Sequence, residues 1–345
     1  MSNEKMDNIL EVENLSYHFH TYGGVVQAVR NVSFNVHRGE ILGIVGESGC
    51  GKSVTSQSIL KLNPEPPGFF QSGSIRFNGQ DIVPMTDRQM REIRGKKIGF
   101  IFQDPMTSLN PTMRIGAQVE EVFVGDKSAT RAQARERALE IFRQLGITDP
   151  ERRLRQYPHE LSGGMKQRVM IAIALIAKPD LIIADEPTTS LDVTIEAQIL
   201  QLLKDMNQKT GVSVIIITHD LGVIAKLCDR VLVMYGGQIV ERGTTDDIFY
   251  RTRHPYTSGL MHSIARLDMD RSTRLTPIEG SPPDLFSPPP GCPFAARCEY
   301  AMEICSECQP PVTEISEQHK TCCWLEHPAA PKVDLTYQGG KHDAG

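Results

Sequence analysis

The sequence has no uninterrupted apolar stretch of the roughly 18 residues that a membrane-spanning helix needs. Its first ten residues also lack the apolar core of a secretion signal, and they include Glu4 and Asp7. We therefore expect a protein that is neither exported nor inserted into a membrane. Long basic runs are missing too, and 37 Lys and Arg residues against 42 Asp and Glu residues give a net charge of −5. Nucleic acid is thus not the expected partner, because nucleic-acid binding typically requires a basic patch.

Enough apolar material is present for a hydrophobic core. Of the 345 residues, 40% are hydrophobic and 23% are charged, which are ordinary values for globular proteins. At about 150 residues per domain, this length fits one large domain with an appendage. Between Leu10 and Tyr250, short β-branched runs alternate with amphipathic stretches, a pattern typical of an α/β fold with a parallel or mixed sheet. The expected strands are Ile41–Val45, Lys97–Phe102, Leu181–Ala184, Ser213–Thr218 and Arg230–Tyr235.

A helical insert is expected between the second and third of these strands. Gly146 ends a helix in which five apolar residues fall on one face, namely Ala134, Ala138, Ile141, Phe142 and Leu145. After Arg251 the composition changes, because this last part holds more than half of the 22 prolines and six of the eight cysteines. We predict a domain of residues 1–250, with a helical subdomain at about 104–178, and an extension of residues 251–345.

The extension is too poor in periodic apolar residues to fold by burial alone. We therefore expect it to be held by contacts with the rest of the chain or by a metal. Its end, from Pro328 to Gly345, is expected to be loose.

One segment has the form of a phosphate-binding loop. Gly46-Glu47-Ser48-Gly49-Cys50-Gly51-Lys52-Ser53 matches G-x-x-x-x-G-K-[ST], and it lies between an expected strand and a helical stretch, as this motif requires. In such a loop the backbone N–H groups turn toward the phosphates and the following helix presents its positive end. Lys52 is expected to reach the β- and γ-phosphates, and Ser53 to offer its hydroxyl to Mg²⁺. The sequence therefore predicts a nucleotide site.

Polar residues also stand at the ends of other expected strands. Asp185 and Glu186 end one strand, and Gln103 and His219 each follow another. The carboxyl ends of parallel strands lie beside the ligand in open α/β sheets. Asp185 suits the Mg²⁺ shell, and Glu186 suits a general base that activates the attacking water. For Gln103 and His219 the residues alone leave the role open, because a single polar residue at a strand end is often only a satisfied surface or core group.

A second segment suited to phosphate is Leu161-Ser162-Gly163-Gly164-Met165. It precedes the apolar helix Val169–Ala177, so the serine and the glycine N–H groups stand at a helix start. One chain therefore holds two phosphate-binding segments.

These motifs, followed by Ser190-Leu191-Asp192, resemble in content and order those of the nucleotide-binding subunits of ATP-binding cassette (ABC) transporters. The resemblance implies an α/β fold: an ABC-type P-loop ATPase domain with a RecA-like core, an antiparallel β subdomain and a helical subdomain, here followed by a small Cys-rich extension. It also implies that two domains bind head to tail, with each ATP held between the phosphate loop of one and the LSGGQ-like segment of the other. Met165 replaces the usual glutamine, with little effect expected, because Ser162 and the glycine backbone make the phosphate contacts.

The same resemblance implies roles for individual residues. Glu186, Gln103 and His219 would be catalytic, with His219 at the γ-phosphate, and Asp192 would bridge the two subunits. Phe19 aligns best with the aromatic residue that stacks on adenine, although neighbouring Tyr17 is a rival and a core role is equally open for either. The Mg²⁺ ligands would be Ser53, Gln103 and Asp185. The implied ATP-binding residues are Phe19, Gly46, Ser48, Gly49, Cys50, Gly51, Lys52, Ser53, Val54, Gln103, Ser162, Gly163, Gly164, Asp185 and Asp192.

A narrower resemblance is to the ATPase subunits of oligopeptide and dipeptide importers. It rests on the runs Phe102–Pro111, His254–Thr257, Gly280–Asp284, Cys292–Phe294 and Arg297–Cys298. It implies ATP hydrolysis coupled to peptide uptake, by a peripheral subunit on the cytoplasmic face of the bacterial membrane. The implied partners are a paralogous ATPase subunit, two transmembrane permease subunits and an extracytoplasmic peptide-binding protein. The alternatives are an importer of nickel or another small solute, and a soluble ABC ATPase in repair or regulation.

Six cysteines crowd between Cys292 and Cys323. Four thiolates at these spacings suit either tetrahedral zinc or a four-iron four-sulfur (4Fe-4S) cluster, and unliganded thiols are a third interpretation. The peptide-importer resemblance favours the cluster, in a structural role. Cys322 is a rival for the fourth ligand and Cys308 a bystander, while the implied ligands are Cys292, Cys298, Cys305 and Cys323.

Overall fold

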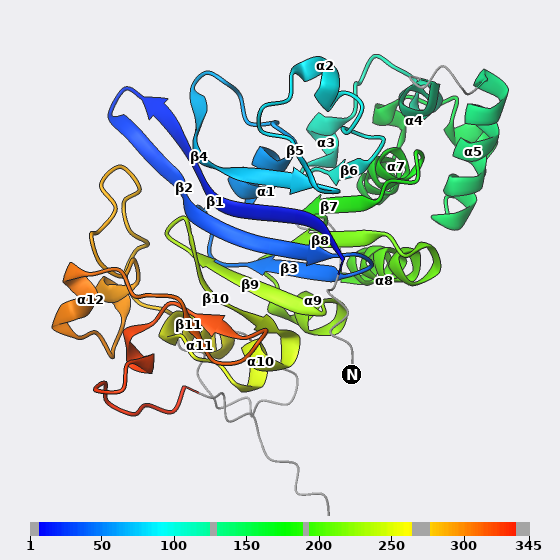
Figure 1. Ribbon diagram of the computed structural model, residues 1–345. Coiled ribbons are helices and arrows are strands. Elements are labelled where there is room, and N and C mark those ends of the chain that lie inside the picture. Colours follow the sequence, from blue (N-terminus) through cyan, green and yellow to red (C-terminus); the bar gives the residue numbers. More distant parts are fainter. Residues whose placement is uncertain (1–6, 125–129, 189–192, 264–276, 336–345) are drawn as a thin grey trace, which may run out of the picture.

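The computed structural model describes residues 7–124, 130–188, 193–263 and 277–335. Within these ranges the chain forms a four-stranded and an eight-stranded sheet, with helices packed beside the larger one (Figure 1). The smaller sheet is antiparallel, and its order is β2 (Gly24–His37), β1 (Asn8–Thr21), β4 (Gly68–Phe77) and β5 (Gln80–Asp81).

The larger sheet is mixed. Strands β9, β3, β8, β7 and β6 are parallel, whereas β10, β12 and β11 continue the sheet in antiparallel fashion. All five expected strands are confirmed to within one residue at either end. The order across the sheet is β11 (Thr313–Glu314), β12 (Lys320–Thr321), β10 (Gln238–Thr244), β9 (Arg230–Tyr235), β3 (Ile41–Val45), β8 (Ser213–Ile217), β7 (Leu181–Asp185) and β6 (Ile98–Ile101).

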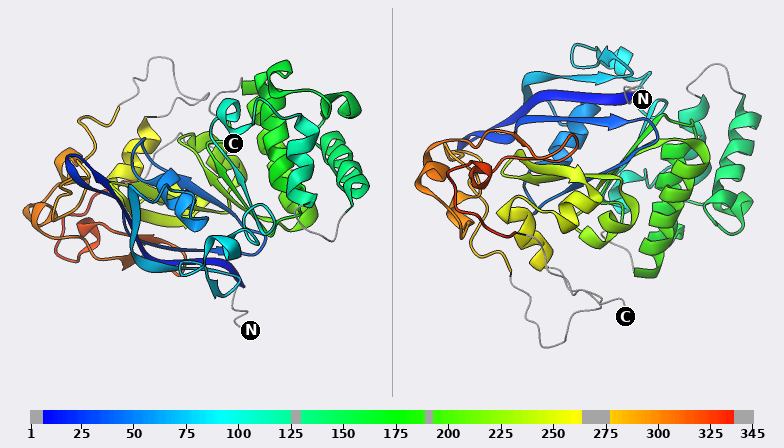
Figure 2. Two further views of the ribbon diagram at one scale, coloured as in Figure 1. Left: turned by 90° about the horizontal axis from the view of Figure 1, so that it is seen from above. Right: turned by 60° about the horizontal axis from the view of Figure 1, so that its bottom comes forward.

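The helical elements fall into three groups. In one group each helix follows a strand of one of the two sheets: α1 (Lys52–Ile59), α2 (Asp87–Met90), α8 (Val193–Thr210), α9 (Leu221–Leu227) and α10 (Thr245–Tyr250). A second forms one end of the molecule (Figure 2): α3 (Pro105–Ser108), α4 (Ile115–Val124), α5 (Arg131–Gln144), α6 (Pro150–Arg153), η1 (Pro158–Glu160) and α7 (Gly163–Leu175). The third belongs to the C-terminal part: α11 (Pro255–His262), η2 (Ala295–Arg297), α12 (Glu303–Glu307) and η3 (Trp324–Glu326).

The helix α5 shows why the insert folds as expected. Thr130 begins it with a capping box, in which its side chain accepts from the Gln133 N–H and the Gln133 side chain accepts from the Thr130 N–H. The predicted apolar face is buried, and the chain leaves the helix at Gly146, whose φ is 64°. Packing of α5 and α4 against α7 follows from this face.

The central parallel strands are buried on both faces, so their side chains divide between two hydrophobic cores. Alternate residues of β8, such as Val214 and Ile216, join the core shared with the helices. Ile215 and Ile217 face the opposite way and pack with side chains of β1, β2 and β4. This arrangement holds the sheet rigidly between two layers.

Several buried residues in the described part of the C-terminal extension join the core that contains the helices. Cys292, Phe294 and Cys305 are buried in the same core as the helices, and β12 pairs with β10 in the larger sheet. His319 hydrogen-bonds through Nε2 to Oε1 of Glu241 at 2.8 Å, and both side chains are buried. The expectation that contacts with the rest of the chain hold this segment is therefore met. In the ranges that the structure describes, no helix is long and apolar enough to cross a membrane.

Candidate functional site

The phosphate-binding loop joins β3 to α1, and its backbone conformation requires glycine at two positions. Gly46 has φ 150°, and a Cβ there would lie 2.2 Å from the carbonyl oxygen of Met234. Gly51 has φ 98° and precedes α1, where a Cβ would lie 2.5 Å from the Ala28 oxygen. Since these neighbours are backbone atoms that cannot turn aside, larger residues would displace the loop from β2 and β9.

Lys52 and Ser53 begin α1 and contact the rest of the site. The buried Lys52 ammonium donates to the carbonyl oxygens of Gly46 at 2.7 Å and Glu47 at 3.0 Å. The Ser53 hydroxyl donates to Oδ1 of Asp185 at 3.0 Å. The structure therefore brings the predicted Mg²⁺ ligands of the loop and of β7 into direct contact.

The three residues expected to be catalytic meet beyond the carboxyl ends of β6, β7 and β8. Nε2 of Gln103 donates to Oε2 of Glu186 at 2.8 Å, and Nδ1 of His219 lies 3.6 Å from Oε1 of the same carboxylate. Glu186 has a φ of 45°, and its N–H donates to the Ile217 oxygen. A non-glycine residue rarely adopts this left-handed conformation. Here it accompanies the bond to β8 at the residue that follows β7.

Burial raises the pKa of Asp185 to about 6, although the hydrogen bond from Ser53 and the charge of Lys52 act in the opposite direction. The neighbouring Glu186 carboxylate raises this pKa further. A hard divalent cation would favour the ionised form of this buried carboxyl, which lies next to the Ser53 hydroxyl and the Lys52 ammonium. The Mg²⁺ ligand set expected from the sequence, Ser53, Gln103 and Asp185, is consistent with this chemistry.

The second phosphate-binding segment lies at the start of α7. Ser162 is exposed and stands at the N-cap in extended conformation, and its side chain makes no capping bond. A Cβ on Gly163 would meet open space. The Gln167 side chain, one turn on, donates to the Pro187 oxygen and so ties α7 to the residues that follow Glu186. The helix start therefore points its N–H groups toward the outside of this chain, where a second molecule can approach.

The two aromatic candidates for adenine differ in burial. Tyr17 is 2% exposed and donates its hydroxyl to Oε1 of Glu65, so its ring is not available for stacking. Phe19 is half-buried and meets the Tyr17 ring edge-on, with 5.4 Å between centroids. Of the two, only Phe19 has part of its ring accessible. Asp192, the expected bridge between subunits, lies outside the described residues.

Two residues that the sequence analysis assigned no role also contact the phosphate-binding loop. The Tyr256 hydroxyl accepts from the Glu47 N–H at 2.8 Å, and the Arg297 guanidinium holds the Glu47 carboxylate. Both belong to the runs that resemble peptide-importer ATPases, His254–Thr257 and Arg297–Cys298. The sequence offered only one signal for these two residues, namely that each is a charged or hydroxyl-bearing residue within such a run.

The prediction of a metal or cluster on the cysteines is not supported. Among the described residues, which include Cys292, Cys298, Cys305 and Cys323, no group of three or more His, Cys, Asp or Glu side chains could hold a metal ion. Burial raises the pKa of Cys292 and of Cys298 to about 11, and that of Cys323 to about 12. Ligation of a metal would require these thiols to lose their protons, because the thiolate is the ligand.

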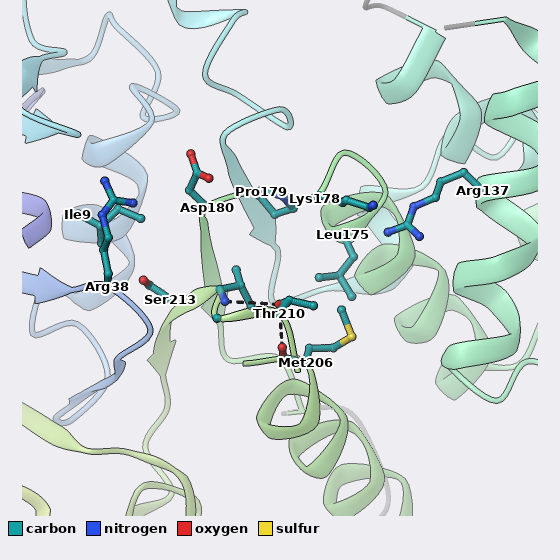
Figure 3. A pocket seen from close by; sticks show the side chains of 12 residues that line it. Ile9, Arg38, Arg137, Leu175, Lys178, Pro179, Asp180, Met206, Thr210 and Ser213 are labelled. Atoms are coloured by element: carbon teal, nitrogen blue, oxygen red, sulfur yellow. Dashed lines mark hydrogen bonds between the residues drawn. The ribbon is translucent and has the colours of Figure 1, made fainter. Parts of the chain in front are cut away.

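A cavity of about 390 Å³ lies away from all of these residues (Figure 3). It opens at the amino ends of β7 and β8, where Asp180 and Ser213 line it together with Arg38, Lys178 and Thr210. The phosphate-binding loop follows the carboxyl end of β3, so this cavity is at the opposite edge of the sheet and is not the nucleotide site.

Comparisons with known proteins decide the family. Residues 29–189 match the family model described as ABC transporter, and residues 240–305 match that of the oligopeptide/dipeptide transporter C-terminal region. The chain is 56% identical to the oligopeptide transport ATP-binding protein OppD of Bacillus subtilis, over 96% of this chain and 92% of the relative. The chain belongs to the ABC transporter ATP-binding proteins. It is 55% identical to the dipeptide transport ATP-binding protein DppD of the same organism, over 96% of this chain and 98% of that one.

A solved ABC structure shows the same fold. The ATP-binding cassette MJ0796, in a dimeric post-hydrolysis state with ADP and Pi, is 29% identical, with a TM-score of 0.62 over 68% of this chain and 98% of that one. The cassette fold and ATP hydrolysis expected for this chain are thereby confirmed. ATP with Mg²⁺ is the typical nucleotide of this ABC family.

Replacement of Asp185 by Asn should stabilise the nucleotide-free ABC protein at alkaline pH. The folded pKa of about 6 exceeds the ordinary value of 3.8, so stability falls as pH rises between these values, because the unfolded chain releases this proton first. We expect Asp185→Asn to gain about 1–3 kcal/mol at pH 8 and less at pH 5. Urea unfolding without nucleotide measures both values. An equal effect at both pH values would contradict burial as the cause.

Proposed function

We propose that this chain is the ATP-hydrolysing subunit of an importer that brings oligopeptides or dipeptides across the bacterial cytoplasmic membrane. The observation that carries the proposal is the similarity along nearly the whole chain to relatives named for oligopeptide and dipeptide transport. This similarity includes the C-terminal region, where a family model specific to such transporters matches residues 240–305. Uptake of nickel or another small solute is the alternative within the same class of importer.

The proposed mechanism assigns each residue of the site a step. The N–H groups of the loop from Gly46 to Ser53 and the start of α1 would bind the phosphates. Lys52, which donates to carbonyl oxygens of its own loop, would reach the β- and γ-phosphates. Mg²⁺, bound to Ser53, Gln103 and Asp185, would supply charge neutralisation at the phosphates.

Hydrolysis itself requires a water placed in line with the γ-phosphate. The Glu186 carboxylate would accept a proton from this water as its oxygen bonds to phosphorus and the bond to the β-γ bridging oxygen breaks. Gln103 and His219 already lie against this carboxylate, so they would fix its position. Phe19 would contact the adenine. In a head-to-tail pair, Ser162, Gly163 and Gly164 would cover the nucleotide of the other subunit, and Asp192 would stand at the interface.

Replacing Glu186 by Gln should abolish turnover and leave ATP bound, because the proton acceptor is lost while Lys52 and the loop remain. We expect the rate of ATP hydrolysis to fall at least ~100-fold and uptake of labelled peptide to stop in the assembled complex. The ATPase rate is measured with the partner's own site inactivated. Glu92→Gln, on the surface near Lys96, is the matched control and should retain wild-type rates.

Undiminished hydrolysis by the Glu186→Gln complex would contradict the assignment of the general base. Uptake of nickel but of no peptide by the wild-type complex would instead favour the alternative substrate.

The proposed partners are two transmembrane permease subunits, an extracytoplasmic peptide-binding protein and a paralogous ATPase as the second member of the pair. The segment from Gln103 to Pro158, which includes most of the helical subdomain, would present a groove to a short helix of a permease at the cytoplasmic face of the membrane. The exposed start of α7 is free to meet the other ATPase.

Purification of the tagged chain from membranes should recover two permeases and one different ATPase in equal amounts. Mass spectrometry identifies every copurifying chain. A complete transporter with two copies of this chain would overturn the heterodimer. Recovery of cytosolic protein with nucleic acid would favour a soluble role in repair or regulation.

We propose further that Cys292, Cys298, Cys305 and Cys323 hold a structural 4Fe-4S cluster. The support is their proximity, because the other three cysteines each raise the pKa of Cys323 beyond the effect of burial. The Cys292 N–H donates to the Cys305 oxygen at 2.7 Å, which joins two of the four directly.

Protein prepared without oxygen should be brown and contain iron and acid-labile sulfide. Cys298→Ser should remove the colour, and Cys308→Ser should retain it, because Cys308 is exposed and lies outside the proposed set. Absorbance and metal analysis measure both. Colourless anaerobic protein with one zinc per chain would refute the cluster.

A further inference from the structure

Glu47 of the phosphate-binding loop is hydrogen-bonded to two residues of the C-terminal extension, Arg297 and Tyr256. The Arg297 guanidinium donates from Nη1 to Oε2 of Glu47 at 2.6 Å and from Nη2 to Oε1 at 3.0 Å. This is the two-pronged geometry that an arginine forms with a carboxylate, and it fixes orientation as well as distance. The Arg297 side chain is 5% exposed and that of Glu47 is 27% exposed, so water weakens this pair far less than one on the surface.

All five N–H groups of Arg297 have acceptors. Besides Glu47, they bind the Tyr235 hydroxyl at 3.1 Å and the carbonyl oxygens of Ile278 and Glu279, each at 2.9 Å. The guanidinium carbon also lies 5.7 Å from the Tyr235 ring centroid and 6.0 Å from that of Phe294. A lysine has one nitrogen and cannot reproduce this forked set of bonds. Arg297 is therefore held rigidly before it meets the loop.

A second contact fixes the backbone of Glu47. Its N–H donates to the Tyr256 hydroxyl, and Tyr256 is fully buried against Tyr235, with 4.4 Å between ring centroids. The N–H of Glu47 thus points toward the extension, and the phosphates are left to the N–H groups that follow it. Because the backbone carbonyl oxygen of Glu47 also accepts from Lys52, a shift of Glu47 would move the ammonium of Lys52 as well.

We propose that Arg297 is a positioning residue for ATP binding. Together with Tyr256 it holds Glu47, so that the C-terminal extension sets the conformation of the phosphate-binding loop and thereby the affinity for ATP. The proposal rests on the proposed function in that ATP is the bound nucleotide, but it does not depend on what is transported.

The test is calorimetric binding of ATP with Mg²⁺ to the full-length chain and its variants. Arg297→Gln should weaken binding about tenfold, the effect expected from the loss of one charged hydrogen bond. Arg297→Lys should recover only part of this affinity. Glu47→Ala should weaken binding to a similar degree, and the double variant should be no weaker than Arg297→Gln, because both act on the same contact.

Arg253→Gln is the matched control. It removes another ion pair of the extension, that between Arg253 and Glu326 at 3.8 Å, and should leave the affinity unchanged. Each variant is measured well below its own melting temperature. A purely structural role for Arg297 would lower that temperature and leave the affinity of the folded chain at the wild-type value, which would overturn the proposal.

Glu47→Ala keeps the proposal testable if Arg297→Gln does not fold, since it leaves the extension intact. Wild-type affinity in Glu47→Ala would also overturn the proposal. Failure of the wild-type chain to bind ATP would contradict the proposed function, which distinguishes that failure from one of the positioning role.

Discussion

The parallel alignment of β3, β8, β7 and β6 is the constraint on which the site depends. Parallel strands end at the same edge of a sheet, so residues far apart in the chain meet there without any direct link between them. Gln103, Glu186 and His219 each follow a different strand, and Gln103 and His219 both contact the Glu186 carboxylate. The alignment survives because both faces of these strands are covered, one by helices and the other by the antiparallel sheet. A shift of one strand would move Glu186, Ser53 and the phosphate-binding loop out of their positions relative to one another.

Sequence reasoning succeeded where the determinants are local. The phosphate-binding loop, the strand ends and the buried face of α5 depend on residues within a few positions of one another, and the structure places them as expected. The positive φ of Glu186 has no such local signal, because the bond to Ile217 that accompanies it is set by sheet pairing. Cysteine spacing alone left zinc, a cluster and unliganded thiols open, since distances between thiols depend on how the C-terminal extension folds against the core.

The contacts of Glu47 also show that sequence reasoning does not predict pairs of residues that are far apart in the chain. Arg297 lies 250 positions away in the chain, and nothing in the sequence near either residue specifies a partner of opposite charge. The pairing follows from tertiary packing of the extension against β9, where the rings of Tyr235 and Phe294 lie beside the guanidinium. Resemblance to peptide-importer ATPases marked the right segment without explaining it. Only the folded structure connects this segment, through Arg297, to the phosphate-binding loop.

The pairing of β12 with β10 has a consequence beyond architecture. Residues 241 and 242 of β10 are covered on their outer side by residues 320 and 321, and β11 covers β12 in turn. An exposed strand edge offers unpaired N–H and C=O groups that can recruit strands from other molecules. The last strands of the extension are only two residues long, too short to template such addition. The extension therefore shields this edge of the larger sheet from pairing with another copy of the chain.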